Sequence, residues 1–209
     1  MSELFSIQLQ NRQQQGRDGV WLDLPTTTEQ VQAALRQIGI SSDNPQGLFI
    51  SGYFAEEEKR FAIPYNMVLA SNVDELNFLA ARLETLSAGE RAELNAALQA
   101  PQSELFSIGR ITDFPENVDY YVHLPDVHGP AQLGDYYLNR SGMVDMPEEW
   151  KGGIDTAQFG RYVAQQEQGV FTEYGYLVKS GDAWQKVHEG QPVPEEYRVL
   201  SFPASEILR

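Results

Sequence analysis

The chain has 209 residues, no cysteine, and 30 acidic against 15 basic side chains, which gives a formal net charge of −15. The absence of cysteine excludes disulfides, thiolate zinc sites, iron–sulfur clusters and a cysteine nucleophile. A chain this acidic is not expected to bind nucleic acid or an anionic membrane directly, because both are negatively charged and bind basic protein surfaces.

The first 62 residues predict a small α+β domain. The alternation over residues 4–9 and the run at 20–24 predict two strands of a hairpin, joined by a polar turn at 13–19. Thr26–Thr28 are placed to cap a helix whose apolar face ends near Gly39. The run at 48–54 predicts a third strand.

Residues 63–102 predict a helical domain. Asn72 or Asp74 can cap a first helix, in which leucines recur at helical spacing. Ser87 and Glu90 have the spacing of a capping box for a second helix, which ends at Pro101. The short join between the two predicts an αα-hairpin.

Residues 103–178 predict a second α+β domain, in which strand-like and helical patterns alternate: 105–111, 119–124 and 169–178 as strands, 131–140 and 155–166 as helices. Residues 179–209 are rich in Gly and Pro and predict a loosely packed extension. The predicted fold class is α+β, as three small consecutive domains (1–62, 63–102 and 103–178) followed by this extension.

One hexapeptide occurs twice: Ser2–Ile7 and Ser103–Ile108 both read SELFSI. Such a match arises by chance on the order of once in a thousand chains. Each copy is followed by a similar strand, WLDLP at 21–25 and YVHLP at 121–125, and by a candidate helix. The pattern favours two related strand–strand–helix units. The alternative is that similar hairpins converged on similar residues.

No catalytic motif is present: there is no nucleophile elbow, phosphate-binding loop or dinucleotide fingerprint. His123 and His128 flank Asp126, but their spacing and Pro125 do not suit a zinc site on a helix. The sequence therefore predicts no enzyme, no metal and no cofactor. It has no secretory leader and no apolar stretch of ~18 residues, so we expect a cytoplasmic protein without membrane contact.

Residues 101–178 are the most acidic part of the chain, with 12 acids against 4 bases. A dispersed negative surface could steer the protein into a basic groove, whereas the plainer interpretation is an ordinary acidic surface. Asp155 is also placed to cap a helix. The candidate partner-binding carboxylates are Asp113, Glu116, Asp119, Asp126, Asp135, Asp145, Glu148, Glu149 and Asp155.

Three segments resemble the ArdA antirestriction family. Residues 69–98 resemble the family's central helical region, including the pattern Glu75, Leu76, Asn77, Leu79 and Ala80. The passage from Trp21 to Gly39 resembles its N-terminal strand-to-helix region. Tyr136–Gly160 resembles the region around its antirestriction motif. The similarity runs in the family's order over roughly residues 4–178.

The resemblance implies an elongated, three-domain homodimer that mimics bent double-stranded DNA and occupies the DNA groove of a type I restriction–modification enzyme. B-DNA carries one charge per ~1.7 Å, so a charge of −15 matches only about 26 Å of duplex, and Arg140 and Lys151 weaken the local mimicry. Candidate dimer-interface residues are Tyr136, Tyr137, Met143, Val144 and Met146.

Two alternatives remain open. One is an ArdA-related inhibitor of a different defence nuclease or effector, which uses residues 179–209 for a specific contact. The other is an acidic protein-interaction module, which predicts no clustering of carboxylates on one face.

Overall fold

The computed structural model describes residues 4–14, 18–56, 60–101 and 103–204. Part of the turn predicted at 13–19, and Ser2 and Glu3 of the first SELFSI copy, lie outside these residues. Contacts divide the chain into two compact units. The first unit comprises 1–86, 105–115 and 186–209, and the second unit comprises 87–104 and 116–185. The division into three consecutive domains stays a prediction.

The first unit contains a three-stranded antiparallel sheet in the order β2-β1-β3. Its strands are β1 (Phe5–Asn11), β2 (Val20–Leu24) and β3 (Leu48–Phe54). Side chains of β1 alternate between buried and half-buried, because successive residues of a strand point to opposite faces. The hairpin and the third strand are confirmed.

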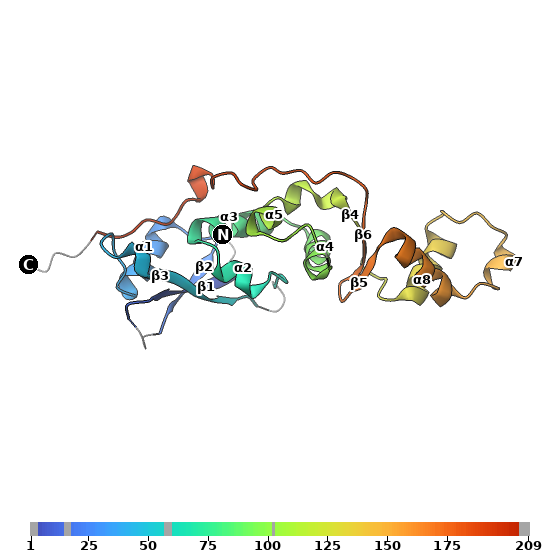
Figure 1. Cartoon of the computed structure of the whole chain (residues 1–209), viewed down its shortest axis with the longest axis horizontal. Helices are drawn as coiled ribbons and strands as arrows, with labels where there is room; N and C mark the ends of the chain where they lie inside the picture. The colour runs from blue at the N-terminus through green and yellow to red at the C-terminus, as the bar shows by residue number, and fades with distance from the viewer. Residues whose placement is uncertain (1–3, 15–17, 57–59, 102, 205–209) are drawn as a thin grey trace, which may run out of the picture. The chain divides into compact units, whose positions relative to one another are not determined.

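Helices cover the buried face of this sheet (Figure 1). They are α1 (Thr28–Gln37), α2 (Tyr65–Leu69) and α3 (Val73–Glu84), while α5 (Ile108–Thr112) packs against α3. Thr27 caps α1 and Asn72 caps α3, each in a capping box with the residue three positions later. The sequence therefore predicted the start of both long helices.

The C-terminal segment 186–204 belongs to the first unit, and we call it the strap. Val199 of the strap is buried. Asp74 Oδ1 accepts the backbone N–H groups of Val199 and Leu200 at 2.8 and 2.7 Å, and Asn77 donates to the carbonyl of Tyr197 at 3.0 Å. The prediction of a loosely packed extension is wrong for these residues, because α3 supplies partners for the strap backbone.

The second unit contains a second antiparallel sheet, in the order β4-β6-β5. Its strands are β4 (Tyr121–Leu124), β5 (Val170–Thr172) and β6 (Gly175–Lys179). Its helices are α4 (Ala88–Gln99), α6 (Pro130–Asp135), the π-helical turn η5 (Tyr136–Arg140), α7 (Glu148–Lys151) and α8 (Thr156–Glu167). Ser87 and Glu90 form the predicted capping box at the start of α4.

Two glycines allow α6 and α8 to pack backbone against backbone. A Cβ atom on Gly160 would lie 1.8 Å from the carbonyl oxygen of Pro130, and one on Gly134 would lie 1.9 Å from that of Thr156. This close approach encloses a core formed by Val127, Leu133, Ala164 and Tyr176.

The second SELFSI copy does not form a strand, so the strand predicted at 105–111 is wrong. Residues 103–107 are irregular, and Ser107 Oγ accepts the N–H of Arg110 at 3.2 Å, which starts α5. Ile108 and Ile111 are both buried at helical spacing. The predicted second strand–strand–helix unit is therefore not observed.

Single turns of 3-10 helix lie at Pro45–Gly47, Phe114–Glu116, Val118–Tyr120 and Glu195–Tyr197. With eight α-helices and two small antiparallel sheets among the described residues, the α+β class is confirmed. The predicted elongated shape stays a prediction.

Candidate partner-binding surface

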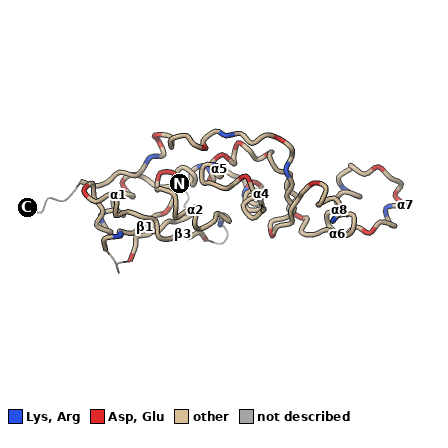
Figure 2. Tube along the Cα trace, in the orientation of Figure 1, with Lys and Arg blue, Asp and Glu red and all other residues tan. Residues whose placement is uncertain are grey.

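Four of the candidate carboxylates are exposed and make neither an ion pair nor a side-chain hydrogen bond with any described residue. They are Asp119, Asp126, Asp145 and Glu149, all in the second unit. Figure 2 shows acidic positions recurring along this unit, with few Lys or Arg between them. These four side chains present full negative charges to solvent.

Two basic residues, Arg140 and Lys151, lie in the segment Tyr136–Gly160, and each forms an ion pair with a nearby acid. Arg140 Nη2 lies 3.4 Å from Asp135 Oδ2, and Lys151 Nζ lies 2.6 Å from Glu148 Oε1. The Lys151 side chain is only 15% exposed, whereas that of Glu148 is 82% exposed. Asp135 and Glu148 therefore balance local positive charge and contribute less to any negative field.

Asp155 is the N-cap of α8. Its Oδ1 accepts the N–H groups of Ala157 and Gln158 at 2.9 and 3.0 Å. The sequence-based interpretation as a cap is confirmed. The helix N-terminus partly offsets the charge of this exposed carboxylate.

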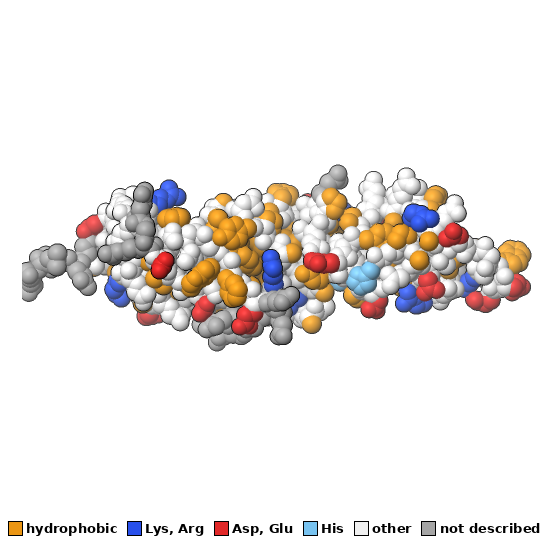
Figure 3. Space-filling model, turned by 90° about the horizontal axis from the view of Figure 1, so that it is seen from below, with side chains coloured by type: hydrophobic (Ala, Val, Ile, Leu, Met, Phe, Trp, Pro, Cys, Tyr) orange, Lys and Arg blue, Asp and Glu red, His pale blue; other side chains and the backbone are white. Residues whose placement is uncertain are grey.

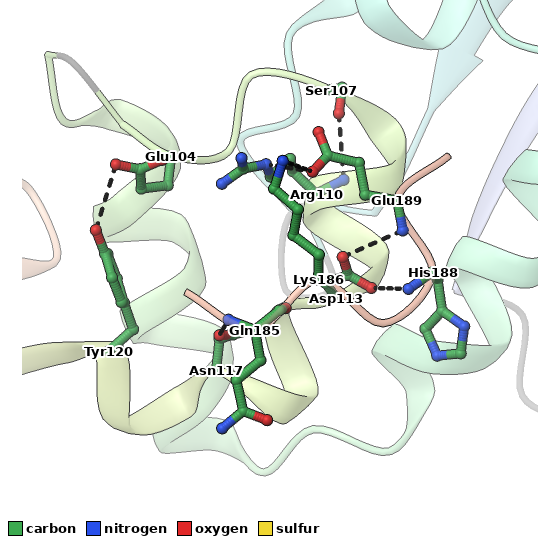
Figure 4. Close-up of polar contacts among 10 residues, drawn as sticks. All are labelled: Glu104, Ser107, Arg110, Asp113, Asn117, Tyr120, Gln185, Lys186, His188 and Glu189. Carbon is green, nitrogen blue, oxygen red and sulfur yellow. Dashed lines mark hydrogen bonds and ion pairs between the residues drawn. The ribbon is translucent and has the colours of Figure 1, made fainter. Parts of the chain in front are cut away.

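Asp113 is not available to a partner. It is fully buried in the first unit, where its carboxylate accepts the N–H groups of His188 and Glu189 at 2.6 and 3.2 Å (Figure 4). Its proposed role on a partner-binding surface is therefore wrong, because a buried carboxylate occupied by backbone donors cannot meet a partner's cations. Glu116 is half-buried, and one of its carboxylate oxygens has no contact with solvent.

The candidate dimer residues differ in exposure. Tyr136 and Tyr137 pack against the core of the second unit, and the Tyr137 hydroxyl donates to Glu167 at 2.5 Å. Val144 and Met146 are half-buried. Met143, at 74% exposed, is the one that presents a large apolar surface.

Sequence reasoning missed two exposed aromatic side chains in the second unit. Trp150 of α7 is 66% exposed and Tyr162 of α8 is 60% exposed. Trp150 stands between Glu149 and Lys151. An aromatic residue flanked on both sides by charges is a signal of surface exposure that could have identified it.

The histidines show no arrangement for metal binding or catalysis. His123 Nε2 lies 2.7 Å from the carbonyl oxygen of Tyr174, and His128 is exposed. Within the described ranges, no group of three or more His, Asp or Glu side chains could hold a metal ion. No helix in the same ranges is long and apolar enough to cross a membrane.

The chain is thus an acidic protein of the mixed α+β class, with uncompensated carboxylates exposed on its second unit. The family model for the antirestriction protein ArdA matches residues 15–178, and the chain belongs to this family. ArdA proteins are non-enzymatic inhibitors, so the prediction of no enzyme is confirmed, and membership implies antirestriction. No curated protein matches the chain. The strap lies beyond the matched residues.

Proposed function

We propose that this protein inhibits a type I restriction–modification enzyme by imitating double-stranded DNA. The observation that supports this most is the set of exposed carboxylates with neither an ion pair nor a side-chain hydrogen bond to a described residue: Asp119, Asp126, Asp145 and Glu149. Carboxylates can stand in for phosphates, and lysines and arginines of the enzyme's DNA groove would then pair with them and release counterions.

The internal pairing of Arg140 and Lys151 also supports the proposal. Arg140 is paired with Asp135 and Lys151 with Glu148, so neither cation is left to repel a basic groove. Because only some of the carboxylates remain uncompensated, the imitation is sparse, with single charges at selected phosphate positions.

A competition assay tests the proposal. The pure protein is expected to displace DNA from a type I methyltransferase core, and added salt is expected to weaken this effect. The variant D145N/E149Q should inhibit less than wild type. The control D18N/E29Q removes the same charge from exposed positions of the first unit and should inhibit like wild type.

Three outcomes contradict the proposal. If wild-type protein fails to compete at low salt, the enzyme target is wrong. If the protein binds DNA itself, imitation is wrong. If both double variants lose activity equally, net charge rather than the carboxylates of the second unit accounts for inhibition.

We further propose that the protein acts in the cytoplasm as a homodimer. Met143 would lie in the dimer interface, with Val144 and Met146 beside it. Substitution of the exposed Met143 by Asp should shift sedimentation from dimer to monomer, because it places a charge in an apolar contact. Sedimentation of wild-type protein as a monomer at all concentrations would contradict the dimer.

A further inference from the structure

A groove of about 460 Å³ lies in the first unit, between α3, α5 and the strap. It is separate from the exposed candidate carboxylates discussed above, which lie in the second unit. It is lined by Glu75 and Phe78 of α3, by Ser107, Ile108, Gly109 and Thr112 at α5, and by the strap residues His188–Val193.

The strap wall of this groove is fixed in place. Asp113 accepts the N–H groups of both His188 and Glu189, and Arg110 Nε lies 2.9 Å from Glu189 Oε2 (Figure 4). The His188 ring stands edge-on against Phe78, with ring centroids 5.0 Å apart. The groove is therefore preformed, which lowers the entropic cost of filling it.

The charged residues of the lining are both acidic. The lining includes Glu75 and Glu189 but no Lys or Arg. Glu189 is balanced by Arg110 and by Lys186, whose Nζ lies 3.3 Å away. Glu75 accepts the N–H of Asn72 in its capping box and makes no ion pair with any described residue. Glu75 is therefore the uncompensated charge of the groove.

The rest of the lining is uncharged, and Phe78, Ile108, Pro192 and Val193 give it an apolar part. An apolar channel beside a carboxylate suits a long aliphatic stem with a cationic head. Among such groups a guanidinium is the best match, because its planar fork pairs bidentately with a carboxylate and is more weakly hydrated than an ammonium. A phosphate or a carboxylate ligand would be repelled by Glu75.

We propose that this groove receives an arginine side chain of a basic protein, with its stem on Phe78 and Ile108 and its guanidinium at Glu75. The choice of a protein as the source of the arginine rests on the proposed function, since a DNA-binding groove supplies exposed arginines. The groove would then be a second contact with the inhibited enzyme, separate from the carboxylates of the second unit.

The test titrates acetyl-arginine amide into the full-length, ¹⁵N-labelled chain, with acetyl-citrulline amide as the neutral isostere. Saturable shifts of the N–H signals of Gly109, Gly190 and Gln191 are expected with the arginine amide and not with the citrulline amide. Glu75→Gln should weaken binding roughly threefold to fivefold, the range of a solvent-accessible charge pair.

Glu90→Gln is the matched control. Glu90 occupies the same capping-box position at the start of α4 as Glu75 does at the start of α3, so both substitutions remove one carboxylate from the same kind of helix start. Three outcomes would overturn the arginine site. The citrulline amide could cause the same signal shifts as the arginine amide, or E75Q could bind the arginine amide as tightly as wild type. The third is that only the signals of Asp145 and Glu149 shift.

The enzyme assay separates this inference from the proposed function. Inhibition that E75Q weakens and E90Q leaves unchanged supports the second contact. If the chain inhibits the enzyme but the groove signals do not move, the arginine site fails and the proposed function stands. If the groove binds the arginine amide but no type I enzyme is inhibited, the site stands and its assignment to that partner fails.

Discussion

Arg140 of η5 extends its guanidinium to Asp135 of α6, with 3.4 Å between Nη2 and Oδ2. Both side chains are about half exposed, so the pair contributes little to stability. Its main consequence is electrostatic, because it removes one acid from the negative surface of the second unit.

Arg140→Gln should therefore raise inhibition roughly twofold to fivefold at low salt, because it removes a cation and releases Asp135. Inhibition constants at low and high salt measure this effect. Arg36→Gln is the control, since Arg36 is an exposed residue of the first unit whose Nη2 donates to the side-chain oxygen of Gln32 at 3.3 Å. Equal gains in both variants would show that net charge alone is responsible.

Gly160→Ala should destabilise the second unit by about 3 kcal/mol, because the new methyl group would overlap the carbonyl oxygen of Pro130 and force α6 and α8 apart. The midpoint of urea unfolding measures the loss. Gly152→Ala is the control, since a Cβ there meets nothing within 4 Å. Similar midpoints for the two variants would refute the backbone packing of α6 on α8.

The features predicted well from sequence are local ones. Helix caps at Thr27, Asn72, Ser87 and Asp155 follow from residues within three positions of each helix start. Alternation in β1 likewise needed only its own seven residues. The exposure of Asp119, Asp126, Asp145 and Glu149 agrees with the general rule that charged side chains are rarely buried, to which Asp113 is an exception.

The features that sequence reasoning missed depend on distant partners. Asp113 is buried because strap residues 75 positions later donate to it, and no local pattern shows that pairing. Residues Phe5–Ile7 of the first SELFSI copy lie in β1, where β2 and β3 pair with the strand on both sides. In the second copy the same residues lead into α5, since tertiary context overrides strand propensity.

Stability should fall as pH rises from about 5 to about 8, because of Glu93. Burial, together with the nearby charges of Glu90 and Asp119, raises the pKa of Glu93 to about 8. Between its unfolded and folded pKa values, the folded state holds a proton that the unfolded state has released, so raising the pH favours unfolding. Above about pH 8 the carboxylate is charged in both states and its destabilising effect is complete.

Glu93→Gln should remove most of this pH dependence and stabilise the protein by about 1 kcal/mol near pH 8, a modest figure because the side chain is partly solvated. Thermal unfolding across this pH range measures it. The exposed Glu149 provides the control E149Q, which should keep the wild-type slope. A wild-type slope in E93Q would mean that Glu93 is ionised in the folded protein.

Deletion of the strap should destabilise the first unit, because the strap packs against this unit. A chain that ends at Gln185 exposes Phe78, which packs against His188 and Tyr197, and leaves Asp113 without two backbone donors. We expect about 3 kcal/mol of destabilisation and faster hydrogen exchange in α3. Unchanged exchange in α3 would show that the strap is dispensable for the fold.

Asp113→Asn tests the same attachment without truncation. The amide keeps one acceptor but turns an N–H donor toward the second backbone N–H, at a cost of about 2 kcal/mol. The exposed Asp182 gives the control D182N, which should cost little.

Since deletion disturbs the fold, lost inhibition in the truncated chain would not identify a contact between the strap and its target. The exposed strap acids Glu195 and Glu196 provide that test: if E195Q/E196Q loses inhibition while α3 exchange is unchanged, the strap contacts the target directly.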